Sequence, residues 1–215
     1  MTTSSSILGM LYLLIPVFGI LSVIPVLDDP NYLTKITKVK NKVIVGSIFQ
    51  INLGLVYLLV GLLFFVSLAN QTFVLRYSFV ILRIVVFIIN LIATLLVLRL
   101  LNLSKSISHF ESRNIQDLKD QGDRLKASRD SLNHIFMIVA LSLSNIVLFI
   151  SLLRLNILPD WLSFWGIFGA FMSILASSLL LIEQTSIYSP FYLGLNLPTA
   201  IQELIFALWL LFIGF

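Results

Sequence analysis

Hydrophobic residues form six long runs separated by shorter polar stretches, and this pattern predicts the architecture. Each run has about 18 residues or more, the length an α-helix needs to cross the hydrocarbon core of a bilayer. We therefore expect one membrane domain, residues 1–215, built as an all-α bundle of six transmembrane helices. The predicted spans are residues 7–27, 43–68, 73–103, 131–153, 161–183 and 198–215.

Composition supports a membrane protein. Of the 215 residues, 59% are hydrophobic and 11% are charged, whereas soluble domains carry about 25% charged residues. The absence of cysteine excludes disulfides, thiol catalysis and thiolate metal sites. No lysine or arginine precedes the first apolar run, and the run has full span length, so we expect a retained helix rather than a cleaved signal peptide.

Two polar segments, after spans one and three, predict short interfacial helices. In residues 28–42, Asp28 or Asp29 can cap a helix with Pro30 at its first position. Tyr32 begins an apolar series at helical spacing with lysines between, typical of an amphipathic helix whose lysines face lipid head groups. A solvated basic loop is the alternative. Residues 104–133 favour a helix on the membrane surface that runs into span four, since opposite charges recur four residues apart.

The basic residues predict the orientation. Ten lysines and arginines lie in the loops after spans one and three, whereas the opposite side has only Arg76 and Arg154. By the positive-inside rule, we expect a multi-pass protein of the cell membrane with loops 28–42 and 104–130 cytoplasmic and both termini outside. The expected partners of the basic loops are the bilayer and its anionic head groups, and not nucleic acid.

Arg83 stands well inside the third hydrophobic run. An ionisable residue there is costly, so it indicates a functional site with a partner on another helix. Asn90 and Thr94 follow at spacings of seven and eleven and share its face. Glu203, about 7 Å into span six by helix rise, is the expected partner. We expect Gln50 and His134 at a depth similar to that of Glu203.

Other residues suggest packing and capping roles. Glycines on one face of a span let helix backbones approach closely, so we expect packing, and homo- or hetero-oligomers, through such faces. Asp130 can hydrogen-bond His134 four residues later, or simply start span four favourably. Tryptophans at a span end indicate an aromatic belt. The packing and belt residues are Gly46, Gly54, Gly61, Gly166, Trp161 and Trp165.

Sequence motifs give no reaction. The chain has no HExxH and no GxSxG pattern. Ser163, His134 and Asp130 could nominally form a hydrolase set, but the predicted topology puts Ser163 and His134 near opposite faces. His109 has no clear ligands around it. We therefore expect no catalytic residues, no metal and no cofactor.

Several stretches together resemble a known family. These are LDDPNYLTKI, LRIV in span three, LPDWLSFWGIFGA and LPTAIQELIFALWLLFIGF. In this order they are similar to the bacterial and archaeal membrane-protein family named domain of unknown function 4386, whose members look like six-helix proteins without an assigned activity. Relatives often have a glutamate three residues after the span-three arginine, where this chain has Val86. The family pattern falls on Asp28, Asp29, Pro30, Tyr32, Arg83, Asp130, Pro159, Trp161, Ser163, Trp165, Gly166, Pro198 and Glu203.

Three functions follow as hypotheses. The first is a non-enzymatic membrane protein for binding, sensing or assembly, favoured by the small-residue faces and the lack of catalytic motifs. The second is a transporter or channel for a small solute, an ion or protons, with Arg83 as an anion contact and Glu203 with His134 as a proton relay. The third is an intramembrane enzyme.

Overall fold

The computed structural model describes residues 3–68, 72–107 and 115–214. The protein is 88% helical, and the described residues contain no strand. Within these ranges, six helices are long and apolar enough to cross a membrane, so the predicted six-span all-α class is confirmed. The helices that contain the six spans are α1 (Thr3–Leu21), α3 (Lys40–Ser67), α4 (Phe73–Ile107), α6 (Met137–Arg154), α7 (Asp160–Leu181) and α8 (Pro190–Phe212).

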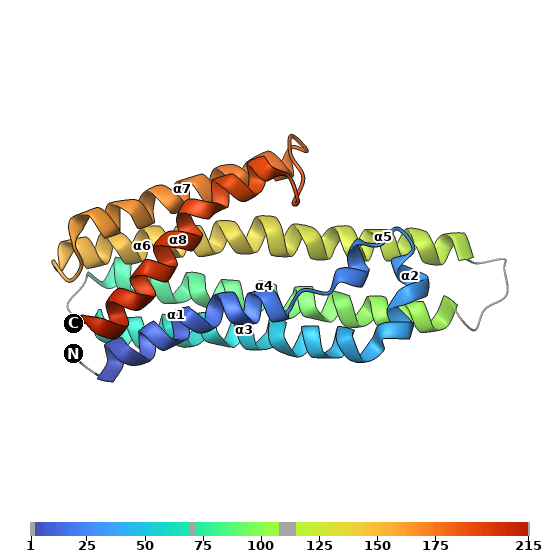
Figure 1. Cartoon of the computed structure of the whole chain (residues 1–215), viewed down its shortest axis with the longest axis horizontal. Coiled ribbons are helices and arrows are strands. Elements are labelled where there is room, and N and C mark those ends of the chain that lie inside the picture. The colour runs from blue at the N-terminus through green and yellow to red at the C-terminus, as the bar shows by residue number, and fades with distance from the viewer. Residues whose placement is uncertain (1–2, 69–71, 108–114, 215) are drawn as a thin grey trace.

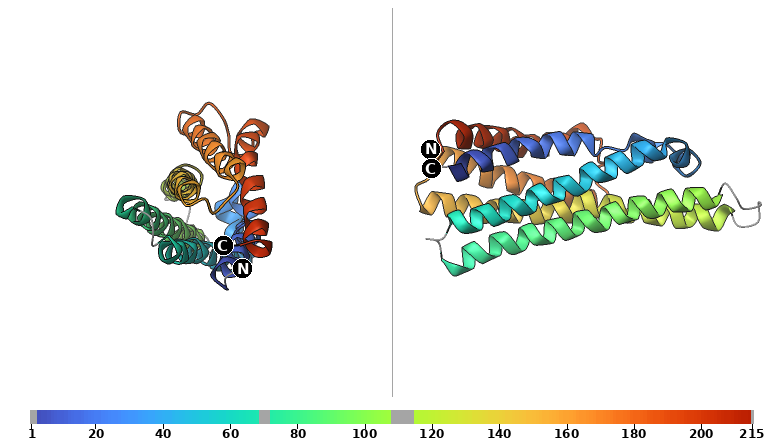
Figure 2. Two further views of the ribbon diagram at one scale, coloured as in Figure 1. Left: turned by 90° about the vertical axis from the view of Figure 1, so that its left-hand side faces the viewer. Right: turned by 90° about the horizontal axis from the view of Figure 1, so that it is seen from below.

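The six helices form a closed ring in chain order. Each packs against the next, α1 on α3, α3 on α4, α4 on α6, α6 on α7 and α7 on α8, and α8 returns to α1. Figure 2 shows this arrangement from one end. The start of α1 and the end of α8 lie at the same end of the bundle (Figure 1), as an even number of spans requires. The ring surrounds a single interior.

Three helices extend beyond the other spans. At the end away from the termini, α3, α4 and the rod formed by α5 (Ile115–Ser131) and α6 continue past α1, α7 and α8 (Figure 1). A π-helical turn, η4 (Leu132–Phe136), joins α5 to α6 without a break. The predicted helix after span three is therefore present, but it continues the line of span four and packs against α4.

Span one is shorter than predicted. Helix α1 ends at Leu21, where the Ser22 hydroxyl donates to the carbonyl of Gly19 at 2.8 Å. The residue before a proline disfavours helical geometry, and Pro25 starts a separate 3₁₀ turn, η1 (Pro25–Asp28). Residues 7–27 are thus not one helix.

The segment after span one folds onto the protein. It contains the short helix α2 (Tyr32–Lys35) and the 3₁₀ turn η2 (Ile36–Val39), which leads straight into α3. Tyr32, Leu33 and Ile36 are buried in a cluster with residues of α3 and α4. The prediction of an amphipathic element is confirmed. Its apolar face packs against α3 and α4. The apolar surface that covers this face is therefore protein and not lipid.

Helix α8 begins eight residues earlier than predicted. Pro190 occupies its first turn, and the Ser189 hydroxyl accepts a hydrogen bond from the backbone N–H of Tyr192 at 3.1 Å. Serine followed by proline is a favourable helix start. Pro198, which we expected at the first position, lies inside the helix. This moves Glu203 deeper into the ring.

The predicted glycine faces are confirmed as packing surfaces. A Cβ on Gly61 would lie 2.7 Å from Cβ of Arg83, and one on Gly54 would lie 3.1 Å from Asn90. On Gly166 it would lie 2.4 Å from the Phe149 ring. These glycines therefore pack helices of one chain together. Oligomerisation stays a prediction and would need other surfaces.

Candidate functional site

Arg83 lies in the centre of the ring. Its side chain is 1% exposed, although it carries a charge. Gly61 on α3 makes room for it, because a Cβ there would overlap the arginine stem. Asn90 and Thr94 on the same face are also buried, at 1% each. The prediction that this polar stripe faces the interior is confirmed.

Asn145 links Arg83 to Glu203. The Arg83 Nη2 group donates to Oδ1 of Asn145 at 2.7 Å, and Nδ2 of Asn145 donates to Oε1 of Glu203 at 2.9 Å. The direct ion pair that we predicted between Arg83 and Glu203 is wrong, since the amide of Asn145 lies between them. An amide suits this place because one end accepts from a cation while the other donates to a carboxylate.

The depth of Glu203 explains why it lies at the level of Arg83 and Asn145. Counting from Pro190, Glu203 lies thirteen residues into α8, about 20 Å by helix rise instead of the expected 7 Å. Arg83 lies ten residues from the start of α4 at the opposite end, about 15 Å. In a core about 30 Å thick the two levels nearly coincide.

Aromatic side chains complete the surroundings of Arg83. Its Nη2 group lies 3.5 Å from the hydroxyl of Tyr12. The guanidinium carbon lies 5.6 Å from the centre of the Tyr57 ring and 5.2 Å from that of Phe79. Both distances fall within cation–π range. The charge is thus held by one amide, one hydroxyl and two ring faces, while its Nε has no partner within the described chain.

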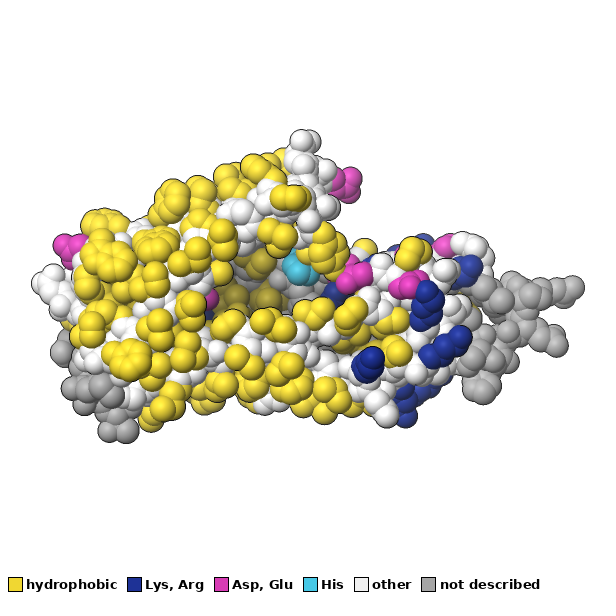
Figure 3. Space-filling view, in the orientation of Figure 1, with side chains coloured by type: hydrophobic (Ala, Val, Ile, Leu, Met, Phe, Trp, Pro, Cys, Tyr) yellow, Lys and Arg dark blue, Asp and Glu magenta, His cyan; other side chains and the backbone are white. Residues whose placement is uncertain are grey.

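Three adjoining cavities lie beside this cluster, and two of them are lined by Glu203. The outermost is about 350 Å³ and is lined by Asp28, Gln50, Asn90, His134 and Tyr188, among others. A second of about 350 Å³ shares Gly19 and Leu53 with it and reaches Glu203. A third, about 160 Å³, contains both Asn145 and Glu203. Figure 3 shows a hollow in the middle of the visible face, with a histidine (cyan) at its edge.

The outermost cavity contains unused hydrogen-bond acceptors. Nε2 of Gln50 donates to Oδ1 of Asn133 at 3.2 Å, while Oε1 of Gln50 has no partner in the described chain. Oδ1 of Asn90 is likewise unpaired. Two buried acceptors without donors are costly, unless a molecule in the cavity supplies N–H or O–H groups.

His134 and Asp130 have different neighbours in the structure. His134 lies in the π-helical turn and lines the outermost cavity together with Gln50. Asp130 instead binds the neighbouring Arg129, with Nη1 and Oδ1 2.7 Å apart. The predicted hydrogen bond between His134 and the Asp130 carboxylate is therefore replaced by an ion pair of Asp130 with Arg129. The expected common depth holds for Gln50 and His134, whereas Glu203 lies in the deeper cavities.

The predicted interfacial motif joins separate parts of the chain. Burial and a hydrogen bond with Asp28 raise the pKa of Tyr188, in the α7–α8 connection, to about 12. The Tyr32 hydroxyl donates to Oδ1 of Asp123 on α5 at 2.8 Å. Asp29 pairs with Lys35, and Pro30 lies in a turn. Asn31, not an aspartate, occupies the N-cap of α2, so the predicted cap is wrong.

The nominal hydrolase set is not brought together. The Ser177 hydroxyl donates to the His134 carbonyl at 3.0 Å, and Ser163 lies fourteen residues earlier on α7, about 21 Å away by helix rise. Trp161 and Trp165 lie at the start of α7 with ring centres 6.3 Å apart. No group of three His, Asp or Glu able to hold a metal occurs in the described ranges, and His109 lies outside them.

Asn145 and Tyr12 are site residues that sequence reasoning missed, and Asn145 is the more informative of the two. Its signal was present, because Ser142, Asn145 and Leu152 recur at helical spacing on the face of α6 that is buried. Tyr12 was missed because a tyrosine in an apolar span resembles an ordinary packing residue. Both contact Arg83 only because the ring brings α1, α4 and α6 together.

Of three comparisons with known proteins, one gives a match. No curated protein and no solved structure matches the chain. One family model matches residues 7–214, nearly the whole chain. The resemblance inferred from sequence stretches is thereby confirmed, and the chain belongs to the family described as domain of unknown function (DUF4386).

Proposed function

We propose that this is a non-enzymatic membrane protein that binds or senses a small polar molecule inside its helix ring. The observation that carries this is the series of adjoining cavities ending at Asn145 and Glu203, where Asn145 also accepts a hydrogen bond from Arg83. Pockets with a few convergent polar groups in an apolar wall are typical binding sites. The unpaired oxygens of Gln50 and Asn90 favour a ligand with hydroxyl or amine groups.

The proposed orientation makes the site accessible from the cytoplasm. We place the protein in the cell membrane with both basic loops cytoplasmic and both termini outside, following the positive-inside rule. Lysines and arginines gather at the end away from the termini (Figure 3). The outermost cavity, with Asp28 and Arg129 at its wall, lies toward that end.

Aromatic packing supports binding over free conduction. Beyond Arg83 the interior is filled by rings of α1, α3, α6 and α8. Tyr12 and Phe206 have ring centres 5.1 Å apart, and Phe149 and Phe206 5.4 Å. Phe64 also packs on Phe206, at 6.3 Å. A site reached from one side and closed on the other suits a binding protein.

A ligand screen on the purified protein tests this proposal. Small polyols, amines and amino acids should be compared by the rise in melting temperature. A ligand at 100 times its Kd stabilises by about 2.7 kcal/mol. Gln50→Leu and Asn90→Leu should abolish the shift produced by a hit. Asn52→Leu is the control, because Asn52 lies on the same helix but bonds its own backbone, at Ile48. Loss of the shift in the control alone would contradict the site.

Transport is the second candidate, and one observation favours it. Two helices that line the cavities carry irregularities, the π-helical turn before α6 and Pro198 inside α8. Such features occur where helices bend and where sites are built. Proteoliposomes loaded with a pH dye would show proton or solute flux, and Glu203→Gln should abolish it. Binding without flux would leave the first proposal standing.

A further inference from the structure

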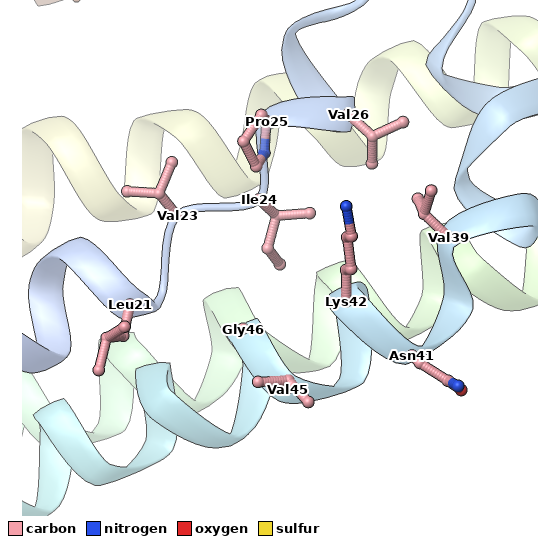
Figure 4. Close-up of a pocket in the computed structure, with 10 residues that line it drawn as sticks. All are labelled: Leu21, Val23, Ile24, Pro25, Val26, Val39, Asn41, Lys42, Val45 and Gly46. Carbon is pink, nitrogen blue, oxygen red and sulfur yellow. The ribbon is translucent and has the colours of Figure 1, made fainter.

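Another cavity lies outside the ring, between the linker after α1 and the start of α3. It measures about 490 Å³. Figure 4 shows its walls. The apolar part comes from Leu21, Val23, Ile24, Pro25 and Val26 on one side and Val39 and Val45 on the other.

This groove exists because of how the chain turns there. Helix α1 stops at Leu21, and the linker crosses α3 at Gly46, where a Cβ would lie 2.7 Å from Cγ1 of Ile24. The missing turns of α1 leave apolar surface uncovered. Val23 is 60% exposed, Val45 49% and Leu21 46%. In water this would be an exposed apolar patch, but beside a membrane span it faces lipid.

One end of the groove is basic. The Lys42 side chain points into the hollow, toward Pro25 and Val26 (Figure 4). An adjoining cavity of about 290 Å³ shares Val39, Asn41 and Lys42 with it and adds Lys38 and Lys40. Within the residues that the structure describes, no carboxylate pairs with these three lysines, and Asp29 is engaged by Lys35. Lys42 therefore lines the apolar slot, and Lys38 and Lys40 lie beside it in the adjoining cavity, all three without an ion pair to a described residue.

We propose that this groove is a binding site for one anionic phospholipid. An acyl chain would occupy the slot from Leu21 to Val45, and the head-group phosphate would lie among Lys38, Lys40 and Lys42. The charge complementarity selects this occupant, because basic pockets beside membrane helices attract anionic head groups. The site lies where α1 ends, toward the end of the molecule at which basic residues gather (Figure 3).

Lipid titration of the full-length protein in detergent tests the head-group half. Phosphatidylglycerol should raise the melting temperature saturably, and phosphatidylcholine should not. Lys42→Gln should weaken the apparent affinity about fivefold, the effect of one basic residue near an anionic surface. Lys119→Gln, on the exposed face of α5, is the matched control. Equal responses to the two lipids, or equal effects of the two substitutions, would overturn the proposal.

The slot is tested separately. Val45→Trp leaves every lysine in place but fills the groove, so it should also weaken phosphatidylglycerol binding. Unchanged affinity would mean that the lysines attract the lipid surface without a discrete site, which contradicts the proposal. Glycerol 3-phosphate, which has the head-group charge and no acyl chain, should give no shift at the same concentration. A shift equal to that of the lipid would assign the lysines to free phosphate instead.

Discussion

At the scale of single residues, Asn145 determines how a buried charge is tolerated. Arg83 and Glu203 are not in direct contact, and the amide forms one hydrogen bond with each of them. A hydrogen bond to a charged group is worth about 1.5 to 3 kcal/mol, more than an exposed ion pair. The amide also fixes the relative positions of α4, α6 and α8. Glu203 also lines two of the cavities.

Replacing Asn145 with leucine should destabilise the protein by about 2 to 4 kcal/mol, because both charged groups lose a partner. Chemical denaturation in detergent measures this. In the wild-type background, Arg83→Leu and Glu203→Gln should show coupling in a double-mutant cycle. In the Asn145→Leu background the coupling should fall close to zero. Equal coupling in both backgrounds would contradict the bridge.

Glu183 is held in a left-handed conformation that suits glycine. It follows α7 with φ of 58°, and Asn156 follows α6 with φ of 51°. Left-handed geometry costs an ordinary L-residue roughly 1 kcal/mol, while asparagine tolerates it well. Glu183→Gly should therefore raise the unfolding free energy by up to about 1 kcal/mol. Asn156→Gly, the matched control, should change it by a few tenths. A larger gain at Asn156 would argue against this reasoning.

The pairing of Asp29 should contribute to acid sensitivity. Hydrogen bonds from Lys35 and from the backbone N–H of Asn31 lower the pKa of Asp29 from 3.8. A carboxyl whose folded pKa is depressed adds stability above its unfolded pKa and loses it as pH falls through the folded value. When the pH is lowered from 5 to 3, the melting temperature of Asp29→Asn should therefore fall less than that of the wild type. Glu183→Gln, which removes an exposed carboxylate elsewhere in the chain, is the control. Its melting temperature should fall with pH as much as that of the wild type.

At the scale of elements, glycine packing sets the spacing of the ring. Gly61 admits the Arg83 stem, and Gly166 admits the Phe149 ring. Because neither neighbour can move without disturbing the core, an added methyl group must displace a helix. The small faces that sequence analysis assigned to packing are thus what keeps the polar cluster compact.

Gly61→Ala and Gly166→Ala should each cost about 1 to 3 kcal/mol, the usual effect of overpacking. Gly194→Ala is the control, since a Cβ there meets nothing within 4 Å. It should be neutral or slightly stabilising, because alanine favours helix. The stability of the three variants is compared by heating each and measuring, by fluorescence-detected size-exclusion chromatography, how much folded protein remains. If Gly194→Ala lost as much stability as Gly61→Ala, the lack of space around the added methyl group would not be the cause of the loss.

Sequence patterns predicted the elements better than their ends. The six spans, the buried face of Arg83, Asn90 and Thr94, and the glycine packing follow from composition and helical period. The start of α8 was misplaced because Pro190 and Pro198 both suit a first helical turn, and only the cap by Ser189 distinguishes them. That error of eight residues changed the depth of Glu203. The bridging Asn145 depends on three helices meeting, which local patterns do not contain.

At the scale of the whole molecule, the closed ring makes one interior with one open side. Sequential packing of six spans leaves the central positions for side chains from every helix. The shorter α1, α7 and α8 leave the basic end less enclosed (Figure 1), while aromatic rings fill the other. The cavities that reach Glu203 adjoin the cavity lined by Asp28, Arg129 and His134, which lies toward the basic loops.

Single cysteines test this one-sided access, and the chain has none of its own. Ser22→Cys lines the outermost cavity, and Asn156→Cys lies between α6 and α7 at the opposite end. With a membrane-impermeant thiol reagent, Ser22→Cys should react in inside-out vesicles and Asn156→Cys in intact cells or right-side-out vesicles. Because the cavity wall is buried from the outer face, Ser22→Cys should stay protected there. Labelling of Ser22→Cys from both sides at equal rates would mean that a continuous water path crosses the ring, which would favour a channel over a closed binding site.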